Sequence, residues 1–259
     1  MHYVVVTTGS CGNCYIFYTG RDTLIIDDGV TFTKLSETMR NHEIPLDTIR
    51  ALFITHLHPD HSKGVGVLQR RLGVPAYISD VSMEKNESLI IKQKIERSLL
   101  HTFAFDDRIS IPGFDILPFA TSHDSDGSAG FAFTSDGVGY FLMTDTGIIP
   151  DEAWDLSRSA DVKFIESNYD EEMLEKGSYP QFLKNRISGR WGHLENKTAV
   201  DFAGKTSKQG DSISFVHLSA NNNTPELVRK VVNEVIPSGI FCKVCCRGEL
   251  FEGFRDGKE

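Results

Sequence analysis

The chain has 259 residues, and its 27 Lys or Arg against 36 Asp or Glu give a net charge of −9 at pH 7. This acidic balance excludes a general nucleic-acid coat protein, and no apolar run approaches the roughly 20 residues that span a bilayer. The N-terminus shows no basic segment followed by an apolar one, so we expect a cytoplasmic protein without a secretory signal or a membrane partner.

Hydrophobic periodicity and turn residues predict strands and helices along the whole chain. In chain order, the predicted elements are strands at 3–7, 14–18 and 23–26, a helix at 32–41, a strand at 51–54, a helix at 62–72, a strand at 75–79, a helix at 81–100, strands at 114–120, 130–134 and 138–143, a helix at 151–158, a strand at 161–166, helices at 179–188 and 195–207, a strand at 212–217 and a helix at 225–236. No linker or repeat divides the chain, and 40% of its residues are hydrophobic. We therefore expect a single domain over residues 1–259.

One short segment is dense in metal-binding side chains. Residues 55–61 (THLHPDH) contain His56, His58, Asp60 and His61 directly after a predicted strand. Imidazole and carboxylate donors suit Zn, Mn, Fe or Ni, and the segment has no thiolate. Sites of this kind more often keep a position open for water, which is the catalytic arrangement. The segment therefore predicts a hydrolytic metal site.

Further donors follow three other predicted strands. They are His123, Asp145 and His217, each just beyond an apolar run. A single His at a strand end is usually a surface residue. The four donors of the 55–61 segment cannot saturate two ions, however, and these three residues together supply the missing ligands.

The motif HxHxDH followed by a spaced His, Asp and His resembles the metallo-β-lactamase superfamily over essentially the whole chain. The resemblance implies an α+β fold, a four-layer αββα sandwich in which two stacked sheets have helices outside. It also implies two divalent metal ions per chain and a supporting role behind the metal loop for Asp27. The implied ligands are His56, His58 and His123 for one ion, Asp60, His61 and His217 for the other, and Asp145 as the bridge.

Within that superfamily, several segments resemble the bacterial YycJ/WalJ-type proteins, which are double-stranded DNA 5′-exonucleases. The segments match in order and spacing; they are 8–13 (TGSCGN), 121–124 (TSHD), 144–147 (TDTG), 166–168 (ESN), 177–180 (GSYP), 192–196 (GHLEN) and 217–223 (HLSANNN). The chain departs at Glu195, where that family usually has Ser, and in a Cys-rich tail after Pro237. The resemblance implies a metal-dependent phosphodiesterase that acts on DNA, in the context of DNA repair.

Hydrolysis of a phosphodiester needs a nucleophile and an acid. Two ions roughly 3.5–4 Å apart can share a hydroxide, because coordination lowers the pKa of water towards about 7. We expect this metal-bridging hydroxide to be the nucleophile, with Asp60 as a ligand that also accepts a proton. His193 is the candidate acid, since segment 192–196 is expected to open a helix whose amides favour an anion. Glu166 would orient His193 or the Lys and Arg residues near it. The alternative for His193 is a position beside a helix cap with no chemical role.

Basic residues gather around His193. Residues 179–208 contain six Lys or Arg and two acids, whereas residues 151–175 contain nine acids and two basic residues. Because phosphate contacts dominate nucleic-acid affinity, we expect DNA or another phosphodiester as the partner, with solvated helix faces as the alternative. Trp191 could stack on a base or pack against the protein. The candidate substrate contacts are Lys184, Arg186, Ser219, Asn222 and Asn223, of which the last three could instead fix their loop.

Other functions stay open at this point. A small-molecule (cyclic or nucleotide) phosphodiesterase would keep the same site, and a carbon-ester, lactone or β-lactam hydrolase is disfavoured without an export signal. A binding protein that has lost catalysis would usually lack a ligand, and none is missing. The Cys-x-x-Cys pairs at 11–14 and 242–245 are expected to be reduced thiols, with a Cys₄ zinc site as the alternative. The oligomeric state and the tail with Cys242, Cys245 and Cys246 are unassigned.

Overall fold

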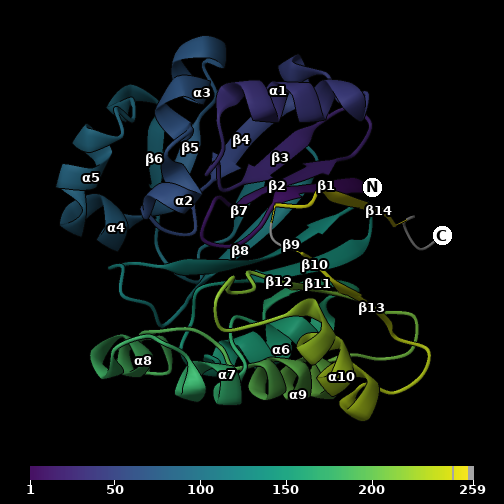
Figure 1. Cartoon of the computed structure of the whole chain (residues 1–259). Coiled ribbons are helices and arrows are strands. Elements are labelled where there is room, and N and C mark those ends of the chain that lie inside the picture. The colour runs from purple at the N-terminus through teal and green to yellow at the C-terminus, as the bar shows by residue number, and fades with distance from the viewer. Residues whose placement is uncertain (247, 256–259) are drawn as a thin grey trace.

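Two sheets of seven strands each, packed face to face, form the centre of the computed structural model, which describes residues 1–246 and 248–255 (Figure 1). From edge to edge, the first sheet contains β14 (Phe251–Phe254), β1 (His2–Thr7), β2 (Cys14–Tyr18), β3 (Thr23–Ile26), β4 (Ile49–Phe53), β5 (Ala76–Ser79) and β6 (Leu100–Phe103). The second contains β13 (Phe241–Val244), β12 (Ser212–Val216), β11 (Val162–Glu166), β10 (Val138–Met143), β9 (Ala129–Ser135), β8 (Phe114–Ala120) and β7 (Ile109–Ile111).

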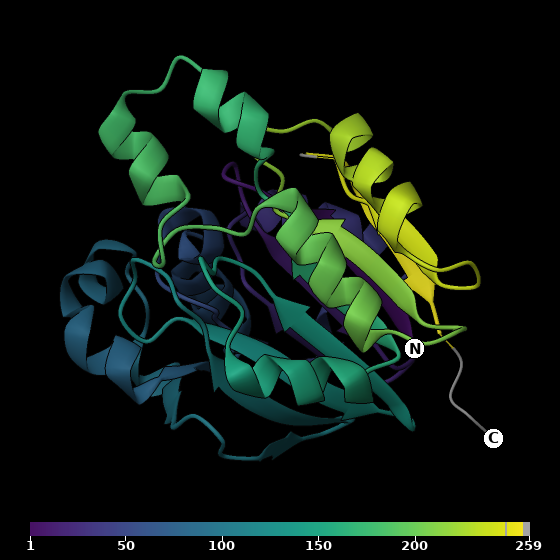
Figure 2. The same cartoon turned by 90° about the horizontal axis from the view of Figure 1, so that it is seen from below.

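Helices cover the outer side of both sheets (Figure 1 and Figure 2). The first sheet carries α1 (Phe32–Asn41), α2 (Pro59–Ser62), α3 (Val65–Leu72), α4 (Asp80–Lys85) and α5 (Glu87–Lys92). The second carries α6 (Asp151–Ser159), α7 (Glu171–Lys176), α8 (Gln181–Ile187), α9 (Asn196–Thr206) and α10 (Pro225–Val235). Across the described ranges, none of these helices combines the length and apolar character that crossing a membrane requires.

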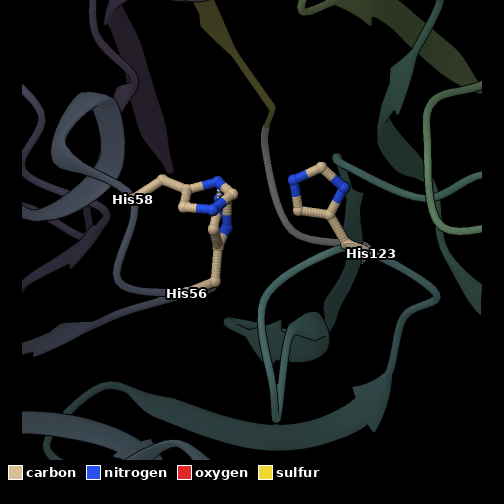
Figure 3. A group of neighbouring side chains, drawn as sticks. All are labelled: His56, His58 and His123. Carbon is tan, nitrogen blue, oxygen red and sulfur yellow. Dashed lines mark hydrogen bonds between the residues drawn. The ribbon is translucent and has the colours of Figure 1, made fainter. Parts of the chain in front are cut away.

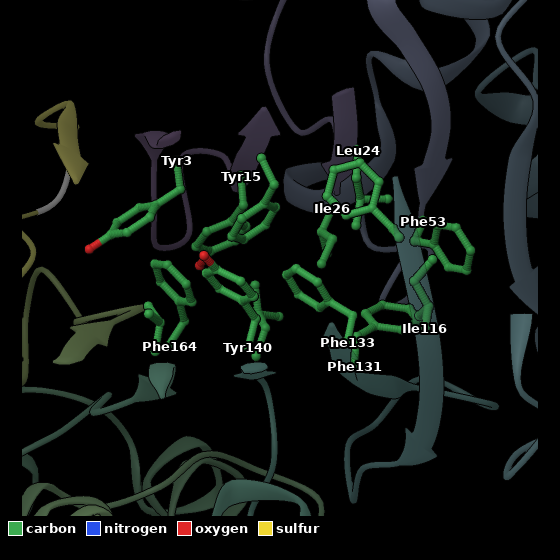
Figure 4. Packing of buried hydrophobic residues seen from close by; sticks show 14 of the residues in the cluster. Tyr3, Tyr15, Leu24, Ile26, Phe53, Ile116, Phe131, Phe133, Tyr140 and Phe164 are labelled. Atoms are coloured by element: carbon green, nitrogen blue, oxygen red, sulfur yellow. The ribbon is translucent and has the colours of Figure 1, made fainter. Parts of the chain in front are cut away.

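Three apolar layers hold the sheets and helices together. Successive side chains of a strand point to opposite faces. Tyr3 of β1 therefore faces the layer between the sheets, whereas Val4 packs towards the helices of the first sheet. The third layer lies between the second sheet and α6, α9 and α10. The layer between the sheets is largely aromatic (Figure 4). Its rings meet edge to face across the sheets, with centroids 5.3 Å apart for Tyr3 and Phe164.

This architecture confirms the predicted α+β fold, the four-layer αββα sandwich. Both sheets are mixed: β3 to β6 run parallel in the first and β10 to β13 run parallel in the second, while the remaining pairs are antiparallel. The prediction of one domain over residues 1–259 stays a prediction; its residues 247 and 256–259 lie outside the described ranges.

Two predicted helices are wrong in their extent. The helix expected at 62–72 begins only at Val65, because Gly64 packs against the loop after β3. Its amide donates to Asp28 O at 2.8 Å, and a Cβ on Gly64 would lie 2.5 Å from Asp28 Cγ. The helix expected at 81–100 is divided at Asn86 into α4 and α5, and Lys94 with a φ of 55° ends the helical path before β6.

Several short elements were not predicted. Among them are α2, β6, β7, α7, β13 and β14, each three to six residues long. Strands of this length are stabilised by their neighbours rather than by their own sequence pattern. β14, for example, pairs antiparallel with β1, which lies at the opposite end of the chain.

Strand ends determine where the candidate site forms. β4, β8, β10, β11 and β12 all direct their carboxyl ends to the same edge of the sandwich. The loops that follow β4, β8, β10 and β12 carry the predicted metal ligands, and β11 ends with Glu166. Residues 56, 123, 145, 166 and 217 are thereby brought together from a span of more than 160 positions.

Candidate metal centre

The loop between β4 and α2 is held from behind by Asp27, the residue that follows β3. Asp27 Oδ1 accepts a hydrogen bond from Thr55 N at 2.8 Å, and Asp27 Oδ2 accepts one from His61 Nδ1 at 2.6 Å. Both carboxylate oxygens are buried. With its Nδ1 occupied in this way, His61 turns Nε2 towards the other candidate ligands, 3.3 Å from Asp145 Oδ2.

Backbone geometry at three strand ends is unusual. Asp27, Asp145 and His217 have φ values of 58°, 53° and 58°, in the left-handed region that residues other than glycine seldom occupy. Each follows a strand directly or after one residue, and the turn directs its side chain across the edge of the sheet. Such conformations cost of order 1–3 kcal/mol each and cluster at functional sites.

His56, His58 and His123 form the first donor group, and their ligand atoms all lie within 4.8 Å of one another (Figure 3). His56 Nε2 lies 3.0 Å from His58 Nδ1. His123 Nδ1 donates to Gly192 O at 3.1 Å, which leaves Nε2 as the ligand atom. Figure 3 shows the His123 ring facing the other two rings across a gap, as the ligands of one ion would.

The second donor group contains Asp60, His61 and His217, again within 4.8 Å. Asp145 lies between the two groups: its Oδ1 is 3.5 Å from His217 Nε2 and 3.8 Å from His123 Nε2. The structure therefore brings the seven predicted ligands into one cluster, with Asp145 in the position of a shared ligand.

Two buried atoms in this cluster, His217 Nε2 and Asp145 Oδ2, have no hydrogen-bond partner among residues 1–246 and 248–255. Buried polar atoms are nearly always paired, so two such atoms facing one cluster of imidazoles and carboxylates need an explanation. A divalent cation satisfies both, because its ligands are unprotonated nitrogens and carboxylate oxygens. The residues present thus fit the binding of divalent metal.

Glu166, the last residue of β11, organises the rest of the site. Its Oε1 accepts hydrogen bonds from His193 Nδ1 at 2.7 Å and from His217 Nδ1 at 3.0 Å. Its Oε2 accepts from the backbone amides of Thr146 and Leu194, both at 3.1 Å. The side chain is fully buried. One carboxylate therefore fixes the ring orientation of a candidate ligand and of the candidate acid at once.

Charges in the cluster shift the pKa values of these groups. Burial alone would lower the pKa of His193, but the Glu166 carboxylate and then Asp145 outweigh it and raise this pKa to about 9. Burial alone would raise the pKa of Glu166, and His193 instead brings it to about 2. His193 and Glu166 are thus an imidazolium and a carboxylate at neutral pH.

The cluster opens into a pocket at the protein surface. Its lining includes the predicted substrate contacts Arg186, Ser219 and Asn222, together with His193 and Ser10. Asn222 Nδ2 is buried and has no partner among the described residues, so a donor is available at the pocket wall.

Two other predicted substrate contacts lie elsewhere. Lys184 does not line this pocket, and its Nζ donates to Glu175 O on the surface beside α7. Asn223 is buried, and its Nδ2 donates to Ser167 O, Asn168 O and Asn196 Oδ1 at 2.8 to 3.0 Å. Asn223 therefore fixes its loop, which was the alternative role predicted for it. Lys184 and Asn223 are not among the proposed substrate contacts.

The expectation that the helix after His193 offers its amides to an anion is also wrong. α9 begins at Asn196, and the carboxylate of Glu195 caps it by accepting from Lys197 N at 2.7 Å and Thr198 N at 2.9 Å. The helix end is therefore already neutralised by a side chain of this chain. His193 precedes the helix and lies at the pocket because of Glu166.

Asp124 is a residue of the site that sequence reasoning missed. Its Oδ1 lies 3.3 Å from His123 Nε2, and its Oδ2 accepts from Arg186 Nε at 2.6 Å. Burial by itself would raise the pKa of Asp124. The hydrogen bond from Arg186 and the charge of His123 outweigh burial, so the pKa lies below its usual value. Its place directly after a candidate ligand was the signal that could have identified it.

Trp191 is 57% exposed, and the Arg190 guanidinium lies over its ring.

The described ranges give no sign of a cysteine metal site. No disulfide joins the five cysteines there, and no group of potential metal ligands in those ranges contains one. Cys14 and Cys245 are buried, and burial raises both pKa values well above their usual level. The expectation of reduced thiols stays a prediction.

Comparison with known proteins places the chain among relatives of one fold. A family model described as the Beta-lactamase superfamily domain matches residues 23–217. The chain is 32% identical over 235 residues to the exodeoxyribonuclease WalJ of Streptococcus pneumoniae (strain D39), covering 90% of this chain and 87% of that protein. It is 30% identical over 253 residues to the exodeoxyribonuclease YycJ of Bacillus anthracis, covering 97% and 94%.

Solved structures are similar in fold. The metallo-β-lactamase fold protein YhfI from Bacillus subtilis superposes with a TM-score of 0.73 over 97% of this chain and 99% of that chain, at 20% identity. Zinc-bound PqqB from Methylobacterium extorquens has a TM-score of 0.71 over 97% and 99%, at 13% identity.

Proposed function

The chain belongs to the beta-lactamase superfamily, and from this premise we propose that it is a DNA exonuclease that works with two divalent ions. The chain is a metal-dependent hydrolase. DNA as the substrate is proposed because relatives named exodeoxyribonucleases match nearly the whole chain. The observation that carries the proposal is one pocket whose lining contains residues of both donor groups. The same lining also contains His193 and Arg186.

The two donor groups define where the ions would bind. The proposed ligands are His56, His58 and His123 for one ion, Asp60, His61 and His217 for the other, and Asp145 shared. Zn, Mn, Fe and Ni all suit these donors. When bound, such ions supply Lewis acidity and lower the pKa of a water towards about 7.

The protein's own groups then handle the protons. Asp60 is part of the pocket wall with a side chain 25% exposed, so its carboxylate can accept a proton from the attacking water. His193 has Nδ1 held by Glu166, which leaves Nε2 as the atom that donates a proton to the leaving oxygen. General acid–base help of this kind contributes typically about 10²- to 10⁴-fold.

Arg186, Ser219 and Asn222 are the proposed contacts to the DNA backbone. Arg186 extends from α8 and is 61% exposed while Asp124 holds its Nε. This pairing fixes the guanidinium at the pocket and leaves further N–H groups for a phosphate oxygen. Asn222 and Ser219 line the pocket from the loop between β12 and α10, and Asn222 Nδ2 has no partner in the described ranges.

The proposal is tested with metal-depleted protein reloaded with Mn, Zn, Fe, Co or Ni. Its substrates are 5′-phosphorylated duplex DNA, a cyclic nucleotide, a lactone and a β-lactam. We expect release of nucleotides from the DNA with at least one metal. Absence of DNA cleavage with all five metals contradicts the proposal, and turnover of the cyclic nucleotide alone would point to a small-molecule phosphodiesterase.

His193→Ala separates the acid from the ligands. We expect this variant to keep its metal content and to lose about 10²- to 10⁴-fold in turnover, as for the loss of a general acid. His101→Ala is the matched control, because His101 lies exposed in β6, outside the pocket lining. His193 also belongs to a donor group with Asp145, Glu166 and His217, so a loss of metal in His193→Ala would make it a ligand and the acid assignment wrong.

A further inference from the structure

A second group of metal-binding side chains lies away from the candidate metal centre. It contains His2 in β1, His42 directly after α1 and Glu252 in β14. The far end of β1 leads to Thr8, whose Oγ1 accepts from His217 N at 2.9 Å beside the centre. At about 3.3 Å per residue along the strand, the second group is roughly 20 Å from that end. The proposed hydrolysis does not use it.

The three donor atoms converge on one point. His2 Nε2 and His42 Nδ1 each lie 2.9 Å from the same oxygen, Glu252 Oε2. All three ligand atoms lie within 4.8 Å of one another. The His side chains are mostly buried, at 12% and 15% exposed, while Glu252 is 45% exposed. Two rings fixed by the protein and one adjustable carboxylate thus surround a position that solvent can reach.

Sheet pairing holds His2 and Glu252 on the same face. In the antiparallel register, His2 is opposite Phe254 and Val4 is opposite Glu252, so His2 and Glu252 are diagonal neighbours. The His2 ring also stacks on Phe254 with centroids 4.2 Å apart and 14° between the planes. Val4 packs towards α1, which shows that this face is the one that meets the helix. The rotamer of His2 is therefore fixed by its surroundings.

His42 is fixed from the helix side. It is the C-cap of α1, and its backbone amide donates to Thr38 O and Met39 O at 3.1 and 3.2 Å. Burial lowers the pKa of His2, although Glu252 opposes this shift, while the hydrogen bond from His2 lowers the pKa of Glu252. A neutral imidazole and an ionised carboxylate are the forms that bind metal.

We propose that His2, His42 and Glu252 form a second, structural site for a divalent cation of the zinc class, which fastens β14 to the end of α1. Two imidazoles and one carboxylate select Zn²⁺, Ni²⁺, Co²⁺ or Cu²⁺ over Mg²⁺ and Ca²⁺, which prefer oxygen ligands. Ligand distances of about 2.0–2.2 Å in a tetrahedral site place donor atoms roughly 3.4 Å apart. The group must open by about half an ångström from its 2.9 Å contacts, which the half-exposed Glu252 side chain allows.

The site joins β14 to the end of α1 as well as to β1. β14 is an edge strand of four residues that pairs only with β1 in the described part of the chain. A cation that binds the folded form stabilises it by mass action. Here the stabilisation acts on the C-terminal strand, because its Glu252 is a ligand and the other two ligands belong to β1 and the end of α1.

The test counts zinc in untagged, full-length protein that has been stripped of metal and then dialysed against micromolar Zn²⁺. We expect the wild type to hold one equivalent more than either His42→Ala or Glu252→Gln. Limited proteolysis near the C-terminus should be slowed several-fold by Zn²⁺ in the wild type and not in the two variants. Equal zinc content in all three proteins would overturn the proposal, whatever the proteolysis shows.

Two controls keep this result independent of the nuclease proposal. His101→Ala removes an exposed histidine from the same sheet and should keep the full zinc content. The ligands of the candidate metal centre are unchanged in the variants, so their remaining zinc and their DNA cleavage should equal those of the wild type. If His42→Ala fails to fold, Glu252→Gln decides the outcome, since the exposed Gln keeps the size and shape of Glu.

Discussion

Replacing Glu166 by Gln should damage catalysis and stability together. The carboxylate accepts four hydrogen bonds, two from imidazole N–H groups on Oε1 and two from backbone amides on Oε2. A Gln side chain has one accepting oxygen and one NH₂ group, so the NH₂ faces either the two backbone amides or the two imidazole Nδ1 atoms. Without changing the size of the side chain, the substitution therefore either leaves the two buried amides without an acceptor or removes the acceptor of the two imidazole N–H groups, whose rings must then give up their Nδ1 protons.

The magnitude follows from those two donors. A buried group that loses its partner costs about 1–3 kcal/mol, so metal-free Glu166→Gln should lose roughly 2–6 kcal/mol of its free energy of unfolding. His193 also loses the charge that raises its pKa to about 9, so less of it is protonated at neutral pH. We expect turnover to fall by about 10²-fold or more, within the range for a general acid.

The assay is urea unfolding of the metal-free protein, followed by DNA turnover of the reloaded protein from pH 6 to 9. Glu234→Gln is the matched control, because Glu234 is exposed on α10. The role assigned to this carboxylate would be refuted if Glu166→Gln had the same free energy of unfolding and the same turnover rate as the control.

Two further predictions concern the shared ligand and a buried ion pair. Asp145→Ala should lose metal, because Asp145 is the residue that both donor groups approach; an unchanged content of two ions, measured by mass spectrometry of the metals, would defeat its bridging role. Lys163→Met should lower the free energy of unfolding by about 3–5 kcal/mol, because it leaves the buried Asp211 carboxylate without the Lys163 Nζ now 2.6 Å away. Urea unfolding measures this, with the exposed Lys92→Met as control, and a loss equal to that of the control would contradict it.

The candidate ligands could be predicted from the sequence because they follow predicted strands. Strand ends are rigid and their apolar runs are visible in the pattern, so His123, Asp145 and His217 stood out beside the dense motif at 55–61. The structure brings these residues into one cluster. Asp124 was missed although it is adjacent to His123, because its pairing with Arg186 depends on how α8 packs.

Helix boundaries show where local pattern is insufficient. The helix at 32–41 has the predicted bounds, with Thr31 as its cap, because its signals are local. The helix begins after Gly64 because Gly64 contacts the loop after β3. The hydrophobic pattern of residues 62–72 cannot predict this contact.

The sequence by itself indicated the αββα class and the candidate ligands, because the dense motif and the strand ends are local features and together resemble one superfamily. The carboxylate of Asp27 was indicated by that resemblance alone. Only the tertiary structure decided which polar residues reach the pocket. Lys184 and Asn223 do not line the pocket, because each bonds to other parts of the protein. Glu195 caps the first amides of α9, and the Glu166 carboxylate binds both His193 and His217. The tertiary structure also assembled His2, His42 and Glu252 from both ends of the chain. The physical reason is that a polar side chain bonds to the nearest available partner in space, and that partner is set by packing between elements distant in sequence.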